Sequence, residues 1–579
     1  MIVTEATSRS PRPVLASSPR PGVPLLVLDV GGSERDIGRA HGELVRGHGG
    51  ADALLGFYPE LPQHLLLGGL ERGTERMVRR LGRPLLAEAL RRMERARPEP
   101  FRARTRAFFE ALGRPEQARF LTVMDVFQNV VGLAGRLPIG GFGRMARSAT
   151  PMCSTSVVWG AASADGTLRH ARNFDFPGIG VWDPTPVVVF VSPDEPGTLR
   201  HGFVTTRGAD VPGVTVFNEA GLVLTAHTRF HREVTFDGAA VVDLGHEIAR
   251  RARSLADAIR IARERRVAST WGLCVSSASE RRAVVLELHA GGVEVVEPRR
   301  GEALLTCANR YRHPRMQVGE VAASPAWGEH SDARERRMRE LLEAARARGG
   351  ATVEDLWALL DDHVDPDAPG VPRTAGGVVR SASTVQSVVV EPEAGAIWVS
   401  VGRVPASAGP WQRIEWRWEG AGARTVAPEG ARGGRPVEPA MEAFVEAVRI
   451  DVGTHDKPAT AAALERAVGL SPADASLRLL AGGLSMRLGR VREAGAHFDA
   501  GLDSERAPFR RGQLLLWASR AADASGDAPR AAALRAELAA TSDPRLWLAR
   551  ADAEKDAGRP WTSRRARRAH AFMLQGDVA

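Results

Sequence analysis

The chain has 579 residues, of which 44% are hydrophobic and 25% are charged. Its length exceeds the roughly 250 to 300 residues at which a single core stops growing, so we expect two or more domains of ordinary globular composition. No stretch approaches the ~20 apolar residues of a membrane-spanning helix, and the N-terminus lacks the apolar run of a secretory signal. We therefore expect no membrane contact and a disordered lead-in over residues 1–24.

The formal net charge of +9 does not indicate a nucleic-acid partner. Lysine occurs only as Lys457 and Lys555, so nearly all basic residues are arginine, and these alternate with Asp and Glu instead of clustering. The three cysteines, Cys153, Cys274 and Cys307, are too few and too scattered for a disulfide framework. They predict a reducing, cytoplasmic location.

Residues 25–152 begin with the apolar run PLLVLDV and continue with Leu, Ala, Phe and Arg at helical spacing, which predicts a mainly helical segment. In residues 153–405, short β-branched runs alternate with turn residues and predict many strands. Two helical stretches interrupt the strands, and Ser254 and Thr352 are their predicted N-caps, because an acidic residue follows each three positions later. Strands with paired helices predict a layered α+β fold.

Periodicity disappears over residues 406–440, where Gly, Pro, Ala and Arg dominate, so this segment is predicted to be a linker. Residues 441–579 are rich in Ala and Leu and are predicted to be helical. Turn glycines at Gly489, Gly526 and Gly558 recur near the 34-residue period of tetratricopeptide (TPR) helix pairs. A generic helical bundle is the alternative. Either architecture would be an interaction module with a possible protein partner.

The stretch TPMCSTSVVWG places Cys153 at the start of a predicted strand. A cysteine there is most often a small buried hydrophobic residue. A hairpin with the following strand TLRHARNFD, centred near Ala164, would set Cys153 opposite Asp175 and bring Arg172 close. Because Arg172 and Asp175 are an odd number apart, a bulge or a strand end is needed to turn both toward the thiol.

These residue types suit one mechanism. If the bond between Met152 and Cys153 were cut, the new α-amino group, with a pKa of about 7.7 to 8.0, could act as the general base for its own thiol. Arg172 would favour the thiolate, and Asp175 would orient the amino group. The tetrahedral intermediate would still need donors for its oxyanion.

The stretch MCSTSVVWGAASADGTLRHARNFDF resembles the nucleophile segment of the penicillin acyltransferase-like (acyl-coenzyme A:isopenicillin N acyltransferase) family of N-terminal nucleophile (Ntn) hydrolases. GSERDIGRAHGEL, VFNEAGLVLTAH and LLTCANRYRHPRM are similar to further motifs of that family, so the resemblance covers about residues 25–405. It implies a four-layer αββα sandwich with a helical N-terminal pro-segment, residues 25–152, and a catalytic core, residues 153–405. The C-terminal all-α, TPR-like region lies outside it.

The resemblance also implies an enzyme that is made as a precursor, cuts itself before Cys153, and transfers acyl groups from amides to water or to an amine. Cys153 would be the nucleophile, Arg172 and Asp175 its charged partners, and Asn218 and Asn309 residues on the oxyanion side. The expected partner is a small-molecule amide or acyl donor. No cofactor is expected, since the early glycines lack a nucleotide-binding pattern. No metal is expected either.

Several alternatives stay open. The sandwich could be a non-catalytic scaffold, or the chain could be an unprocessed cysteine hydrolase that uses His227 as its base. NEAG, which begins at Asn218, could be a plain β-turn. His227 and His231 are four residues apart, which suits a metal only on a helix, whereas this stretch alternates like a strand. Arg380 could be a further cation of the pocket or a surface residue.

Overall fold

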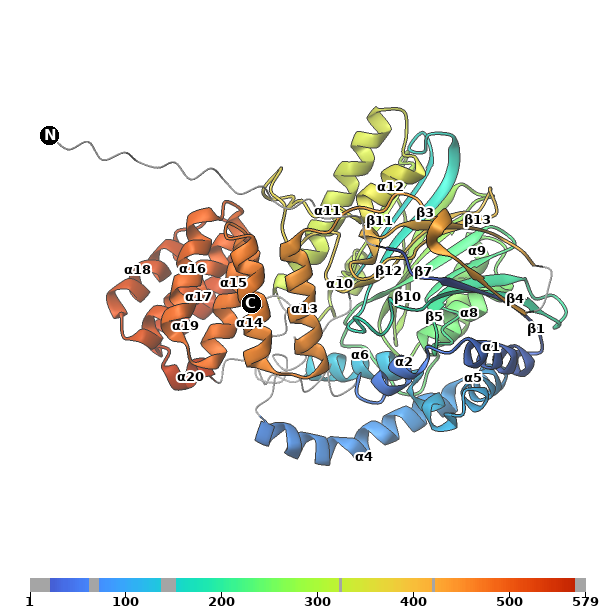
Figure 1. The fold of residues 1–579 in the computed structure, drawn as a ribbon, viewed down its shortest axis with the longest axis horizontal. Coiled ribbons are helices and arrows are strands. Elements are labelled where there is room, and N and C mark those ends of the chain that lie inside the picture. Colours follow the sequence, from blue (N-terminus) through green and yellow to red (C-terminus); the bar gives the residue numbers. More distant parts are fainter. Residues whose placement is uncertain (1–20, 62–71, 137–151, 322–324, 419–421, 568–579) are drawn as a thin grey trace.

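Two β-sheets pack face to face in the β-rich part of the chain, with helices on both outer faces (Figure 1). The computed structural model describes residues 21–61, 72–136, 152–321, 325–418 and 422–567. The predicted lead-in, residues 1–24, lies almost entirely outside them. The αββα sandwich predicted for the fold is confirmed.

The first sheet contains nine strands within the described residues. β1 and β4 run parallel, and the other neighbouring strands are antiparallel. β1 comes from the segment before Cys153 and lies inside the sheet, so that segment is an integral part of the sandwich. In spatial order the strands are β10 (Gly292–Val296), β9 (Arg282–His289), β8 (Trp271–Ser277), β7 (Leu222–Thr228), β6 (Thr215–Asn218), β5 (His201–Thr206), β4 (Pro186–Pro193), β1 (Leu25–Gly32) and β15 (Gly422–Val426).

The second sheet contains six strands in the same part of the chain and is antiparallel throughout. Its adjacent inner strands β2 and β3 are the hairpin predicted around Cys153. In spatial order the strands are β11 (Leu304–Cys307), β2 (Cys153–Gly160), β3 (Gly166–Asp175), β12 (Thr384–Glu391), β13 (Ala396–Ser400) and β14 (Trp411–Glu415).

Alternation along the strands divides the core into layers, as the two-residue period of a strand requires. In β4, Val188 and Phe190 face the second sheet, whereas Val187 and Val189 face the outer helices. Those outer helices are α1 (Glu34–His48), α5 (Glu99–Ala111), α8 (Val241–Arg251) and α9 (Leu255–Glu264). The second sheet is covered by α11 (Pro325–Ala347) and α12 (Val353–Leu360).

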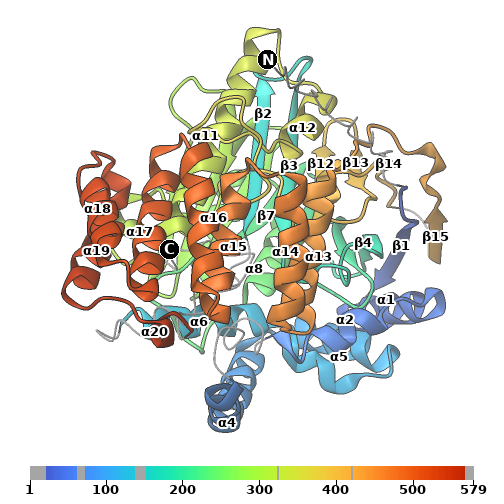
Figure 2. The ribbon, with the colours of Figure 1, turned by 60° about the vertical axis from the view of Figure 1, so that its left-hand side comes forward.

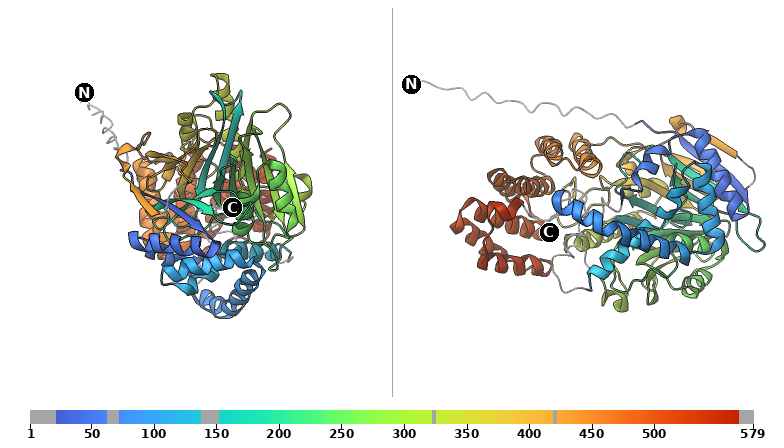
Figure 3. Two further views of the ribbon diagram at one scale, coloured as in Figure 1. Left: turned by 90° about the vertical axis from the view of Figure 1, so that its right-hand side faces the viewer. Right: turned by 90° about the horizontal axis from the view of Figure 1, so that it is seen from below.

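Helices from the segment before the nucleophile hairpin lie together on one side of the sandwich (Figure 3, blue). Buried ion pairs attach them: Arg104 contacts Asp210 at 2.8 Å, and Arg97 contacts Asp243 at 2.8 Å. The remaining elements of this region are α2 (Asp52–Phe57), α4 (Arg72–Ala96), η1 (Pro115–Phe120) and α6 (Val123–Ala134).

Both predicted N-caps are confirmed. Ser254 accepts a hydrogen bond from the Asp257 N–H, and Thr352 forms a reciprocal capping box with Asp355. These contacts satisfy backbone donors that a helix start leaves unpaired.

The nucleophile hairpin differs by one residue from the predicted register. Cys153 pairs with Phe174 and not with Asp175, and Gly160 pairs with Gly166. The turn is therefore centred on Ser163, and an irregularity between Val158 and Gly160 shifts the pairing beyond it. Asp175 is the last residue of β3, so the strand end that the odd spacing of Arg172 and Asp175 required is present.

Residues 406–440 differ from the expected linker, because they contain β14, β15, η2 (Ala406–Ala408) and η3 (Pro428–Gly430). β14 extends the second sheet beside β13, and β15 pairs with β1 at the edge of the first. Each strand has five residues and is partly exposed, and short edge strands carry little hydrophobic pattern.

Helices make up the rest of the described chain, and they stand at one end of the sandwich (Figures 1 and 2). Gly489 and Gly526 end two of them in the left-handed conformation, with φ of 77° and 87°, as their predicted turn role requires. The tetratricopeptide assignment stays a prediction. The elements, called the C-terminal helices below, are α13 (Pro439–Gly453), α14 (Lys457–Leu470), α15 (Ala475–Leu488), α16 (Val491–Ser504), α17 (Pro508–Ser525), α18 (Ala528–Ala539), η4 (Pro544–Leu546), α19 (Trp547–Gly558) and α20 (Ser563–Arg567).

Candidate active site

Cys153 lies at the start of β2 with 1% of its surface exposed. Nη2 of Arg172, on the neighbouring strand β3, donates to its Sγ at 3.5 Å. The same guanidinium donates to the Thr215 hydroxyl at 2.8 Å, to the Ala226 carbonyl at 2.8 Å and to the Val214 carbonyl. Three acceptors on the opposite sheet therefore hold Arg172 against the thiol.

Burial raises the pKa of the Cys153 thiol, although the Arg172 charge acts in the opposite direction. The thiolate predicted beside Arg172 is thus not the resting form in the uncut chain. Since the thiolate is the nucleophile, the site needs a base to take the proton.

Asp175 is a carboxyl that interacts with the Cys153 thiol and could accept its proton. Its Oδ1 accepts from the Thr384 hydroxyl at 2.6 Å, while its Oδ2 is buried and has no hydrogen-bond partner. Burial raises the pKa of Asp175 to about 6, against the lowering effects of Arg334, Thr384 and Arg172. Its backbone N–H also donates to the Met152 carbonyl at 2.9 Å, which is the carbonyl of the bond predicted to be cut.

Asn309 holds the nitrogen of the nucleophile. Its Oδ1 accepts from the Cys153 N–H at 2.9 Å and from Nη2 of Arg334 at 2.9 Å. Its Nδ2 donates to the Thr228 carbonyl at 3.0 Å, and its own N–H donates to the Ser331 hydroxyl. The structure brings Asn309 to Cys153 as predicted, but the contacting atom is the amide oxygen, an acceptor, and not a donor for an oxyanion.

Arg334 was not singled out from the sequence. It is fully buried on α11, and Nη1 donates to the Cys153 carbonyl at 2.6 Å and to the Ser154 hydroxyl at 2.8 Å. Trp327, Ser331 and Arg334 follow at positions i, i+4 and i+7, so one face of α11 points at the nucleophile. That spacing could have indicated Arg334 as a site residue, but several neighbouring arginines on the same helix made it hard to distinguish.

Asn218 is not brought to Cys153. It ends β6 on the face toward α8, where its Nδ2 donates to the carbonyls of Ala249 and Ala252 at 2.9 Å each. Its Oδ1 accepts from the N–H groups of Ala220 and Leu222 at 3.1 Å. All four hydrogen-bonding positions of the amide are thus used, and the predicted oxyanion role is corrected to that of a turn residue that ties the sheet to α8.

The remaining candidates have partners other than the thiol. His227 shares a hydrogen bond with the Thr155 hydroxyl at 2.9 Å, and burial holds the pKa of its ring well below the ordinary value. His231 stacks on His289. Arg380 is buried, beside Asp361 and Glu438. Among the described residues no group of three potential ligands could hold a metal ion.

Apolar side chains surround the reactive groups, and most are sequence neighbours of the residues just described. Phe174 stacks on Phe176 at 5.4 Å and packs edge-on against Trp182 at 5.2 Å. Met152 and Trp327 belong to the same buried cluster. An acyl group attached to Cys153 would therefore meet an apolar surface.

A four-layer αββα sandwich with a buried cysteine at the start of one inner strand, and an arginine and a carboxyl near the end of the next, defines a hydrolase or acyltransferase of the Ntn type. Residues 165–404 match the profile of the family described as acyl-coenzyme A:6-aminopenicillanic acid acyl-transferase, so the sandwich part of the chain is similar to that family. The family prediction is confirmed. The match includes Arg172, Asp175 and Asn309, and Cys153 lies just before it.

One similar solved structure is the Caenorhabditis elegans N-acylethanolamine-hydrolyzing acid amidase (NAAA) ortholog. It is 15% identical, with a TM-score of 0.30, and the alignment covers 42% of this chain and 93% of that chain. A likeness this distant carries no argument about substrate. No curated protein matches the chain. No helix in the described ranges has both the length and the apolar character to cross a membrane.

Proposed function

We propose that the chain is a cysteine Ntn enzyme that cuts its own backbone between Met152 and Cys153 and then breaks carbon–nitrogen amide bonds through an acyl thioester on Cys153. The observation that carries the proposal is the set of contacts on this peptide bond. Asp175 donates its N–H to the carbonyl on one side of the bond, and Asn309 accepts the N–H on the other.

In the self-cleavage step, Sγ of Cys153 attacks the carbonyl carbon of Met152, and the thiol proton passes to Asp175. The peptide nitrogen leaves as an amine and takes up a proton, so that Met152 is joined to Sγ as a thioester. Water then hydrolyses the thioester and leaves a Met152 carboxylate and a free thiol. The Asp175 N–H, which donates to this carbonyl, would stabilise the negative charge on its oxygen by about 2.7 to 4 kcal/mol.

After cleavage, the α-amino group of Cys153 would replace Asp175 as the base. Its usual pKa of about 7.7 to 8.0 suits proton exchange with a thiol near neutral pH. The unpaired Oδ2 of Asp175 would accept a hydrogen bond from the new ammonium, and Asn309 Oδ1 would keep the nitrogen in place. Arg172 would stabilise the thiolate as it forms.

The substrate class follows from the surroundings of the thiol. The aromatic rings of Phe174, Phe176 and Trp182 favour an apolar acyl group, since burying apolar surface gains about 25 cal/mol per Å². We therefore expect amides of apolar acids, with water or an amine as the acceptor of the acyl group.

Intact-mass measurement of purified protein tests the proposal. Wild-type protein should contain two chains that meet between Met152 and Cys153, and Cys153→Ala should remain one chain. The second chain should then gain one acyl mass when treated with acyl p-nitrophenyl esters. A wild-type chain that stays whole, or an ester adduct that forms equally on Cys153→Ala, would contradict it.

A further inference from the structure

The loop of residues 361–383 joins α12 to β12 and ends beside the catalytic carboxyl. The Asn173 side chain donates to the Val379 carbonyl at 3.2 Å, and the Phe176 N–H donates to the Ser383 carbonyl at 2.9 Å. The next residue, Thr384, donates its hydroxyl to Asp175. Thr384 is the first residue of β12 and pairs with Asp175 across an irregularity in the ladder, so the end of the 361–383 loop adjoins the residue that gives Asp175 its hydrogen bond.

A tight turn fixes the direction of that hydroxyl. The Ser381 N–H donates to Oγ1 of Thr384 at 3.1 Å, and the Thr384 N–H donates to the Ser381 carbonyl at 3.0 Å. With one N–H already directed at its oxygen, the Thr384 hydroxyl is left to donate to Asp175. A shift of the turn would remove this alignment, because hydrogen bonds weaken steeply with angle.

The middle of the loop is bound to the C-terminal helices by a ring of four charged side chains, called the charge ring below. Arg373 donates to Glu505 at 2.6 Å and to Asp365 at 3.3 Å, and Arg510 lies 3.3 Å from Glu505 and 3.9 Å from Asp365. Asp365 and Arg373 belong to the loop, whereas Glu505 and Arg510 belong to the helices. The Glu505 side chain is fully buried, so its charge is neutralised by Arg373 and Arg510 and not by water.

Backbone groups of the loop are held as well. The Thr374 N–H donates to Oδ2 of Asp474 at 2.8 Å, and the Ala375 N–H donates to the Ser476 hydroxyl at 3.2 Å. The following residue, Gly376, has φ of 103°, and a Cβ there would lie 2.4 Å from the Arg510 guanidinium. A glycine is needed at this position because the loop backbone passes directly against the helices.

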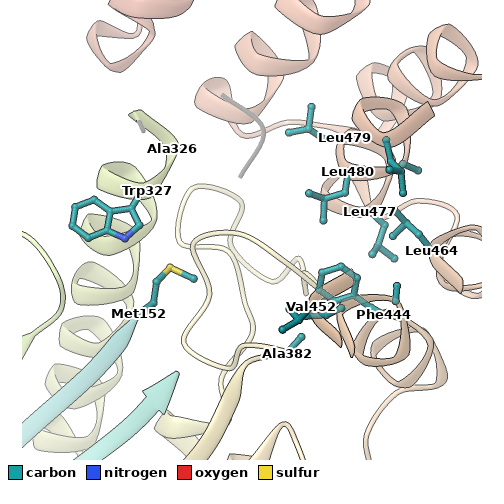
Figure 4. Packing of buried hydrophobic residues seen from close by; sticks show 14 of the residues in the cluster. Met152, Ala326, Trp327, Ala382, Phe444, Val452, Leu464, Leu477, Leu479 and Leu480 are labelled. Atoms are coloured by element: carbon teal, nitrogen blue, oxygen red, sulfur yellow. The ribbon is translucent and has the colours of Figure 1, made fainter. Parts of the chain in front are cut away.

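Apolar packing continues this junction toward the nucleophile. Ala382, at the end of the loop, belongs to the same buried cluster as Phe444 and Val452 of α13 and as Met152 and Trp327 near the nucleophile. Figure 4 shows these residues where the sandwich meets the C-terminal helices. The helices and the residue that precedes the nucleophile thus share one core.

We propose that the C-terminal helices are a positioning part of the catalytic unit, which clamps the 361–383 loop through Glu505 and so holds Thr384 against Asp175. The clamp residues on the helices lie beyond the family match, which ends at residue 404. The sequence alone predicted a partner-binding module for these helices. The proposal rests on the proposed function only in that Asp175 acts in self-cleavage.

The test compares Glu505→Gln with Asp499→Asn. Both remove one negative charge from the C-terminal helices, but Asp499 forms an exposed pair with Arg530, outside the charge ring. Hydrogen exchange reports whether residues 379–386 are held, and the pH dependence of self-cleavage, followed on gels from freshly translated chain, reports the state of Asp175. In Glu505→Gln we expect about tenfold faster hydrogen exchange in this segment. We also expect the acidic limb, the pH range in which the cleavage rate falls as Asp175 becomes protonated, to lie about one pH unit higher, which slows cleavage about tenfold at pH 5. Asp499→Asn should match wild type in both.

The sign of the pH shift separates the clamp from simple electrostatics. Loss of a nearby negative charge would by itself favour the ionised form of Asp175 and move the limb down, whereas loss of the Thr384 hydrogen bond moves it up. Unchanged exchange over residues 379–386, or a limb that stays or moves down, would overturn the proposal. If the wild-type chain does not cleave, the proposed function fails, and hydrogen exchange still decides on the clamp.

A second variant covers the case in which Glu505→Gln does not fold. The double variant Arg373→Gln/Glu505→Gln removes one positive and one negative charge, and the remaining Asp365 and Arg510 keep the junction neutral. The same faster exchange and the same upward shift of the pH dependence are expected in it, because the ion pair between Arg373 and Glu505 is still absent. Wild-type behaviour of the folded double variant would overturn the clamp.

Discussion

Replacing Thr384 by Val removes a hydroxyl from Asp175 and preserves the shape of the side chain. A hydrogen bond to a charged acceptor stabilises it by about 1.5 to 3 kcal/mol, and 1.36 kcal/mol corresponds to one pKa unit. Because the bond at 2.6 Å favours the carboxylate, its loss should raise the pKa of Asp175 from about 6 by about one to two units. Self-cleavage needs the ionised carboxylate, so Thr384→Val should cleave about 10- to 100-fold more slowly at pH 5 and nearly normally at pH 9.

The assay is the rate of self-cleavage of freshly translated chain transferred to buffers from pH 5 to pH 9. Thr384→Ser is the matched control, since it keeps the hydroxyl and should keep the limb near 6. A limb that stays in place in Thr384→Val would refute the electrostatic reasoning. A rate that falls equally at every pH would refute it as well, because that result reports displaced geometry and not an altered carboxyl.

Other variants test the remaining assignments. Asp175→Asn should leave the chain whole. It should also raise the free energy of unfolding by up to about 3 kcal/mol above pH 7 but not below pH 4, because the pKa of Asp175 is about 6 in the folded chain and lower in the unfolded chain, so the ionised carboxylate destabilises the fold. Equal stabilisation in thermal unfolding at both pH values would contradict this. Asn218→Ala should lower stability by about 1 to 3 kcal/mol through lost buried hydrogen bonds, yet its chain should cleave at the wild-type rate; slow cleavage by folded protein would return Asn218 to the site. Asn309→Ala should slow cleavage at least tenfold at every pH, as measured on gels, since the Cys153 nitrogen loses its acceptor; an unchanged rate would remove Asn309 from the mechanism. The two chains should co-elute in size-exclusion chromatography without denaturant, because β1 lies between β4 and β15; separation in native buffer would contradict the sheet order.

Local patterns predicted much of the fold. Ser254 and Thr352 were identifiable as N-caps because capping depends on residues only three positions apart. The β2–β3 hairpin was predictable for the same reason, but its register was not, since an irregularity beside Gly160 moves Cys153 opposite Phe174. β14 and β15 were missed because short edge strands are fixed by their partners more than by their own hydrophobic pattern.

The site residues also divide into those that local sequence predicted and those that it did not. Cys153, Arg172 and Asp175 lie within one hairpin, and Asn309 reaches them through β11, which pairs with β2. Arg334 and Thr384 come from elements that are 180 or more residues away from Cys153 or Asp175, and only tertiary packing brings them close. Asn218 shows the opposite error, since a turn motif in the expected order suggested a catalytic role and the amide serves the turn itself.

The most direct measurement is N-terminal sequencing combined with intact mass of purified wild-type protein that has been shown to turn over an amide. Two N-termini are predicted, with the new one reading Cys-Ser-Thr-Ser from Cys153. Full amide turnover by protein that carries only the uncut 62.2 kDa chain would contradict the account.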